Sequence, residues 1–276
     1  YLEIQGKLEE AAQVWERIAV NYPSSDQSFQ GAFFAGILHF RRGDLTAAVN
    51  SLNRAVLLAL DPLETAGAYL WLGKVSQSQG DTEKAHEYWN SASAADPAGY
   101  YGLRALELLE GREAFTSPET LNLRIDMTSA REVAAAWMRT SFNLPPQVNL
   151  DYSAELWSDA RFTRAVEYWS LGLYTQARQE FESLRTANRL DVVNSFRLLK
   201  TFQDYGFYAS AIETSQTIAT LAGYSNIALA ENLPAYFAYS YYGAYYLPWV
   251  QKAADTYGVP VLILLSLIHQ ESRFQP

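Results

Sequence analysis

Three glycines at a constant spacing constrain this chain more than any other feature. Successive members of the set Gly6, Gly43 and Gly80 are 37 residues apart. Each glycine is followed by alanine after five residues, by a large apolar side chain after nine, and by isoleucine or alanine after twelve. The matching sets are Ala11, Trp15 and Ile18; Ala48, Leu52 and Ala55; and Ala85, Trp89 and Ala92. A period of this length is typical of proteins that stack one helical unit repeatedly, because a single unit cannot bury its apolar face alone.

Proline residues mark where each unit ends. Pro23, Pro62 and Pro97 follow the three sets, and proline cannot continue an α-helix. The residues before Gly43 and Gly80 also have helical spacing, so we expect each unit to be an antiparallel pair of helices. The third unit resembles the tetratricopeptide repeat. The residues that carry this resemblance are Leu72, Gly73, Ala85, Trp89, Ala92 and Pro97.

The same pattern returns later in the chain. Gly172 and Gly206 are 34 residues apart, and small or apolar residues follow each of them. These residues are Ala177, Phe181 and Leu184 after the first, and Ala211, Ser215 and Ile218 after the second. Between the two arrays the sequence predicts helices at 102–109 and 129–139, separated by Pro118 and by Pro145 and Pro146. No segment shows the alternation of a strand, and we predict an all-α chain, an α-solenoid of antiparallel helix pairs.

Composition excludes several classes of function. The chain of 276 residues has no cysteine and a formal net charge of −9, which argues against a cysteine-rich zinc site and against nucleic acid as a partner. His39, His86 and His269 are scattered, so we expect no metal and no cofactor. The longest apolar stretch, 259–268, is about half of the ~20 residues that a membrane-spanning helix needs. We therefore expect no transmembrane segment.

The last residues differ from the repeats. The nearly all-apolar stretch Val261–Ile268 predicts a helix buried on all sides. Glu271 lies three residues after Ile268 and seven after Leu264, so it continues an apolar stripe and should lie at the edge of a core. Desolvation there would favour the protonated carboxyl, which is the form that a general acid needs. The alternative is a glutamate in solvent at a fraying helix end.

This region resembles a known family. Residues 264–274, with the sequence Leu-Leu-Ser-Leu-Ile-His-Gln-Glu-Ser-Arg-Phe, are similar to the start of the catalytic domain of soluble lytic murein transglycosylases. Two preceding segments, Tyr-Leu-Pro at 246–248 and Tyr-Gly-Val-Pro at 257–260, strengthen the resemblance. The family places a superhelix of helical repeats before a lysozyme-like α domain. The resemblance implies that Glu271 is the catalytic acid and base and that Ser272 helps to position substrate. It also implies cleavage of peptidoglycan without water, with a 1,6-anhydro product.

The resemblance completes the expected organisation. We expect tetratricopeptide-like repeats over 1–97, an irregular helical connector over 98–160, and further helical repeats over 161–235. A linker and the truncated start of the catalytic domain would occupy 236–276. The family's remaining motifs lie downstream of its glutamate, and only five residues follow Glu271. We therefore expect this polypeptide to be a fragment without useful activity.

Several alternatives and partners remain open. The family implies a periplasmic or other extracytoplasmic location, with peptidoglycan glycan strands as substrate and possible protein partners on the repeat surface. The alternatives are a helical-repeat scaffold for protein interaction and a lysozyme-like glycoside hydrolase. Eight aromatic residues lie within 236–249. Aromatic rings can stack on sugars, but packing between the repeats and the catalytic domain is the favoured interpretation.

Overall fold

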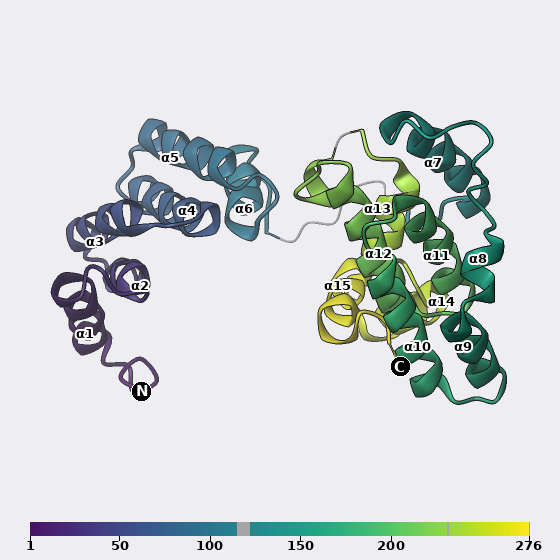
Figure 1. The fold of residues 1–276 in the computed structure, drawn as a ribbon. Coiled ribbons are helices and arrows are strands. Elements are labelled where there is room, and N and C mark those ends of the chain that lie inside the picture. The colour runs from purple at the N-terminus through teal and green to yellow at the C-terminus, as the bar shows by residue number, and fades with distance from the viewer. Residues whose placement is uncertain (115–121, 231, 276) are drawn as a thin grey trace. The chain divides into compact units, whose positions relative to one another are not determined.

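The computed structural model describes residues 1–114, 122–230 and 232–275 (Figure 1). This part of the chain contains fifteen α-helices and one short 3-10 helix, and it contains no strand. The prediction of an all-α solenoid of antiparallel helix pairs is confirmed. The chain divides into two compact units, Tyr1–Thr116 and Ser117–Pro276, each of which is described by itself. Pro118 and Pro276 lie outside the described residues.

The first unit is a row of six helices in which neighbours along the chain pack together. They are α1 (Leu8–Asn21), α2 (Ser28–Arg41), α3 (Leu45–Leu58), α4 (Pro62–Ser78), α5 (Thr82–Ala95) and α6 (Tyr100–Leu109). Gly43 and Gly80 form the tight turns within the α2–α3 and α4–α5 pairs, with φ of 80° and 83°. Such left-handed backbone is easily adopted only by glycine. The repeat glycines are therefore required by the turn that reverses the chain.

Each helix after such a turn begins with an aspartate cap. The side chains of Asp44 and Asp81 accept hydrogen bonds of 3.0 Å from the amides of Ala47 and Lys84. These carboxylates satisfy backbone amides that have no partner inside the helix, a contribution of about 1 kcal/mol each. The predicted repeat positions on α3 and α5 are completely or almost completely buried. They are Ala48, Leu52 and Ala55 on α3, and Ala85, Trp89 and Ala92 on α5.

The second unit contains two further helix pairs and the elements around them. The helices are α7 (Met127–Ser141), α8 (Ala154–Ser158), α9 (Ala160–Ser170), α10 (Tyr174–Ala187), α11 (Val192–Asp204), α12 (Tyr208–Leu221), η1 (Ile227–Leu229), α13 (Ala235–Tyr242), α14 (Leu247–Tyr257) and α15 (Val261–Ser272). Gly172 turns the chain between α9 and α10, and Gly206 turns it between α11 and α12. Every predicted repeat position on α10 and α12 is buried. The helices predicted at 102–109 and 129–139 correspond to α6 and α7.

Helix α15 differs from the prediction of a helix buried on all sides. Leu265 is its only buried residue, whereas the side chains of Ile263 and Leu267 are 45% and 55% exposed. The helix packs through one stripe, formed by Val261, Leu264, Leu265 and Ile268, against the cluster around Val250. Its opposite face has no covering element among the described residues. No helix in this part of the chain is long and apolar enough to cross a membrane.

Candidate functional site

The turn that follows α15 fixes the position of the Gln-Glu-Ser sequence. Arg273 and Phe274 adopt left-handed backbone, with φ of 49° and 61°. This conformation costs roughly 1–2 kcal/mol for each residue that is not glycine. The turn brings the Phe274 ring, which is 1% exposed, into the apolar cluster with Ile212, Leu247 and Leu265. Burial of this ring offsets the backbone cost.

Polar contacts also hold the turn at residues 273–275 against α10 and α12. The Arg273 guanidinium lies 2.5 Å from the Glu213 carboxylate on α12, which also pairs with Arg185 on α10 at 2.6 Å. Arg178 of α10 donates a hydrogen bond of 2.7 Å to the side-chain oxygen of Gln275. The residues immediately after the motif are therefore held against the repeat helices.

Glu271 itself lies outside this anchored cluster. Its side chain is exposed, and its carboxylate forms no hydrogen bond or ion pair with any residue that the structure describes. The prediction that Glu271 lies at the edge of a core is wrong for the described residues, because Glu271 lies four residues after the exposed Leu267, on the same face of α15. The preceding segment is helical, as predicted. The catalytic role of Glu271 stays a prediction.

Two side chains near Glu271, those of Ser272 and His269, form contacts within the protein. The Ser272 hydroxyl donates a hydrogen bond of 3.2 Å to the carbonyl of Ile268, one turn earlier in α15. The imidazole of His269 lies 3.2 Å from the carbonyl oxygen of Tyr241 and packs on the Tyr241 and Phe274 rings. Of the side chains of His269, Glu271 and Ser272, only that of Glu271 has no polar partner in the described chain. The substrate-positioning role of Ser272 also stays a prediction.

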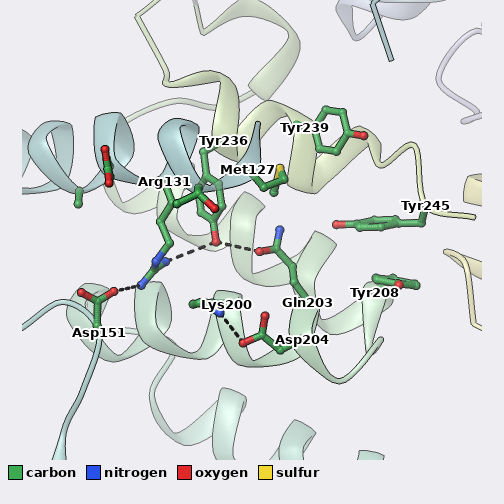
Figure 2. Close-up of a pocket in the computed structure, with 13 residues that line it drawn as sticks. Met127, Arg131, Asp151, Lys200, Gln203, Asp204, Tyr208, Tyr236, Tyr239 and Tyr245 are labelled. Atoms are coloured by element: carbon green, nitrogen blue, oxygen red, sulfur yellow. Dashed lines mark hydrogen bonds and ion pairs between the residues drawn. The ribbon is translucent and has the colours of Figure 1, made fainter. Parts of the chain in front are cut away.

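The second unit also contains a pocket of about 590 Å³ that the sequence did not reveal (Figure 2). Helices α7, α11 and α13 provide most of its lining, and Asp151, Tyr208 of α12 and Tyr245 provide the rest. The lining residues are Met127, Thr128, Arg131, Glu132, Ala135, Asp151, Lys200, Gln203, Asp204, Tyr208, Tyr236, Tyr239 and Tyr245. They span more than a hundred positions of sequence, so no local pattern groups them. The tyrosine-rich stretch 236–249 was the one available signal, and it supplies three of them.

A network of satisfied polar groups forms one side of the pocket. Arg131 donates hydrogen bonds to the Asp151 carboxylate at 3.0 Å and to the Leu150 carbonyl at 3.1 Å. Its guanidinium lies 4.1 Å from the centre of the Phe196 ring. The hydroxyl of Tyr236 donates a hydrogen bond of 2.8 Å to Gln203 (Figure 2). These contacts fix Arg131 and Tyr236 before any ligand arrives.

Burial is the main electrostatic influence on the phenols of this pocket. Desolvation raises the pKa of Tyr236, although the nearby Arg131 guanidinium opposes the change. Burial also raises the pKa of Tyr245. The Tyr245 hydroxyl donates a hydrogen bond of 2.8 Å to the carbonyl of Ser240. Both phenols are therefore neutral hydrogen-bonding groups at physiological pH.

One aromatic ring connects the pocket with the motif turn. Tyr245 stacks on Tyr208, with ring centres 3.9 Å apart and planes inclined by 15°. The Tyr245 ring also packs edge-to-face on the Phe274 ring, with ring centres 5.3 Å apart. Phe274 follows Glu271 by three residues. Tyr208 and Tyr245, which line the pocket, and Phe274, which follows the Gln-Glu-Ser sequence, thus belong to one apolar cluster.

The aromatic stretch 236–249 divides between packing and exposure. Tyr236 and Phe237 are 1% and 0% exposed and belong to the main core of the second unit. Tyr242, Tyr246 and Trp249 are 50%, 43% and 72% exposed. Packing in the core of the second unit explains the first part of this stretch but not the last. Packing between the repeats and a catalytic domain stays a prediction.

Comparison with known protein families gives a match in the first unit. Residues 1–25 match the tetratricopeptide repeat family. The matched segment contains α1 and the turn before it, and it supports the repeat interpretation of the first unit. No curated protein matches the chain. Tetratricopeptide-like repeats suggest a helical-repeat scaffold.

Proposed function

We propose that this chain is the helical-repeat scaffold of a peptidoglycan lytic transglycosylase in which Glu271 is the acid and base. The observation that carries the proposal is the Gln-Glu-Ser sequence at 270–272, which ends a helix and is followed by an anchored turn. Phe274 inserts into the repeat unit, while the Glu271 carboxylate remains accessible to a large substrate. A polymer such as a glycan strand requires this kind of access.

The chemistry needs only one carboxyl group. Protonated Glu271 donates its proton to the oxygen between N-acetylmuramic acid and N-acetylglucosamine, and the bond from that oxygen to the muramoyl C1 breaks. The resulting carboxylate takes the proton of the muramoyl C6 hydroxyl, and that oxygen forms a new bond to C1. The product is a 1,6-anhydro sugar, water is not consumed, and the glutamate is again protonated. Usual glycosidases instead need two carboxyl groups. Ser272 would position the substrate beside the glutamate.

The exposure of Glu271 limits what residues 1–276 can do alone. A general acid works best when its surroundings keep it protonated near neutral pH. In the described part of the chain the Glu271 side chain is exposed. We therefore expect residues 1–276 by themselves to release no product from murein. This function would place the protein outside the cytoplasmic membrane, where peptidoglycan lies.

A glutamine substitution at the proposed acid tests the chemistry. In the product of the complete reading frame, Glu271→Gln keeps the side-chain shape and removes the titrating proton. We expect release of soluble muropeptides from purified murein, measured by mass spectrometry, to fall by a factor of roughly 10²–10⁴. Glu87→Gln, which changes an exposed glutamate on α5, is the matched control and should retain full activity. Undiminished release by Glu271→Gln would remove Glu271 from the mechanism.

The match to the tetratricopeptide repeat favours a second candidate, a scaffold that binds protein partners without chemistry. The enzyme needs the Glu271 carboxyl group for its function in the cell, whereas the scaffold does not. If the deletion phenotype of the gene is rescued as well by Glu271→Gln as by the unchanged protein, the scaffold interpretation is correct. Failure of Glu271→Gln to rescue, at equal protein abundance, supports the enzyme.

A further inference from the structure

We propose that the pocket in the second unit binds a neutral saccharide ring, with Tyr208 and Thr128 among its contacts. This binding site is separate from the proposed chemistry, and it needs no contribution from Glu271. The choice of an N-acetylated sugar as the probe does rest on the proposed function. The pocket volume of about 590 Å³ falls within the range of known small-molecule sites, roughly 300–1,000 Å³.

The charges around the pocket argue against an anionic ligand. Its lining contains two cationic side chains, Arg131 and Lys200, and three carboxylates, Glu132, Asp151 and Asp204. Each cation is already paired, because Arg131 lies 3.0 Å from Asp151 and Lys200 lies 2.5 Å from Asp204. A phosphate or a carboxylate would find no unpaired cation and would meet the remaining charge of Glu132. A neutral ligand avoids both costs.

The polar groups that remain available suit a ligand with several hydroxyls. The hydroxyls of Thr128 and Tyr208 and the carboxylate of Glu132 form no side-chain hydrogen bond with any other residue that the structure describes. Hydroxyl groups can both donate and accept hydrogen bonds, and the Glu132 carboxylate is an acceptor. The hydroxyls of a saccharide can donate hydrogen bonds to the Glu132 carboxylate and can exchange hydrogen bonds with the Thr128 and Tyr208 hydroxyls.

The aromatic wall supplies the apolar contact that a sugar ring needs. Tyr208, Tyr239 and Tyr245 line one side of the pocket, and the first and last of these rings are stacked (Figure 2). The face of an aromatic ring is electron-rich and attracts partial positive charge. The axial C–H bonds of a pyranose carry such charge. The pocket thus combines an aromatic wall with a few fixed polar groups, the composition expected of a specific site.

Titration of the complete protein with N,N′-diacetylchitobiose tests this proposal. We expect saturable binding, detected by nuclear magnetic resonance at sugar concentrations up to about 10 mM. Tyr208→Ala should weaken the affinity by roughly 3- to 10-fold, through the loss of ring contact and one hydroxyl. Tyr257→Ala, at a tyrosine that is 79% exposed on α14, is the matched control and should leave the affinity unchanged. If Tyr208→Ala does not fold, Thr128→Val tests the same pocket at an exposed position, with an expected loss of roughly 2- to 10-fold.

Two further arms separate the possible outcomes. Glu132→Gln should change the sugar affinity by no more than about two-fold, because a neutral hydroxyl can bond to either side chain. Absence of sugar binding would overturn the proposal, as would binding that Tyr208→Ala and Thr128→Val leave intact. Binding of choline that Glu132→Gln abolishes, without sugar binding, would identify a cation site instead. Repeating the titration with Glu271→Gln separates this proposal from the reaction, because the pocket should bind sugar whether or not Glu271 is catalytic.

Discussion

Gly36 lies where α2 crosses α3, and substitution to alanine there should destabilise the first unit. A Cβ atom at Gly36 would lie 2.6 Å from Cγ of Leu52 and 3.3 Å from the Leu52 amide nitrogen. Ordinary contact begins at 3.4 Å, so the Leu52 side chain would have to move by 3.4 − 2.6 = 0.8 Å. Leu52 is 0% exposed, so its side chain would have to move within the apolar core of the first unit.

The expected magnitude follows from two opposing contributions. Overpacking a core costs about 1–3 kcal/mol, and the nearby α3 backbone places Gly36→Ala at the upper end of that range. Replacing glycine by alanine inside a helix contributes about 1 kcal/mol in the other direction. We therefore expect a net loss of about 2 kcal/mol in the free energy of local opening. Native-state hydrogen exchange of the α2 and α3 amides measures this quantity.

A second substitution tests the cause. Leu52→Ala removes the two side-chain atoms that the new Cβ would meet below 3.0 Å and leaves only the amide nitrogen at 3.3 Å. In that background Gly36→Ala should become neutral or stabilising by up to about 1 kcal/mol, because the helix-propensity gain remains. An unchanged loss of about 2 kcal/mol in the Leu52→Ala background would refute the close α2–α3 contact as the reason for glycine at this position.

Three other predictions concern the second unit. Phe274→Ala should lower the free energy of unfolding by about 3–5 kcal/mol, because the ring is 1% exposed. Hydrogen exchange should show a larger loss of protection in α15 than in α11, and unchanged protection of α15 in the variant would contradict the anchoring role. Arg131→Met removes the hydrogen-bond donors to Leu150 and Asp151 and should lower the free energy of unfolding, measured in urea, by about 2–3 kcal/mol. An unchanged free energy of unfolding would show that these hydrogen bonds contribute little. Burial raises the pKa of Tyr245 above its ordinary value of 10.0, so the stability that this phenol contributes is complete below pH 10 and is lost as the pH rises further. Urea unfolding at pH 8 and pH 11 should therefore show a smaller alkaline loss for Tyr245→Phe than for the unchanged protein, and equal losses would contradict this reasoning.

The repeat architecture could be predicted because its causes are local in the sequence. Gly43 and Gly80 are required by the left-handed turn, and the alanines and large residues at fixed offsets are required by the helix contact that follows. The same logic located Gly172 and Gly206 in the second unit. These signals depend on spacing within one or two helices, so a single sequence contains them.

Burial of the last helix could not be predicted in the same way. An apolar helix predicts a covering layer, but the sequence does not show which faces of α15 the described chain covers. Ile263 and Leu267 stay exposed because α15 packs through the stripe that contains Leu265. Glu271 is exposed because it lies four residues after Leu267, on the exposed face of α15. The left-handed turn at Arg273 and Phe274 could not be predicted either, since neither residue type signals such a turn.

The pocket could not be predicted because it depends on tertiary packing. Arg131 and Tyr236 are 105 positions apart in sequence and meet only when α7 packs on α13. The tyrosine-rich stretch indicated sugar stacking or packing, and it could not indicate Lys200 or Gln203 on α11. Composition argued against nucleic acid as a partner of the whole chain, and the paired charges of this pocket argue locally against an anionic ligand.

Isotope labelling tests the proposed reaction most directly. Digestion of murein in ¹⁸O-labelled water by the product of the complete reading frame should yield muropeptides with the mass of 1,6-anhydro ends and no ¹⁸O, since the muramoyl C6 oxygen attacks C1. Incorporation of one ¹⁸O atom at each new reducing end would contradict the account and identify a lysozyme-like hydrolase, and complete absence of products would leave the helical-repeat scaffold.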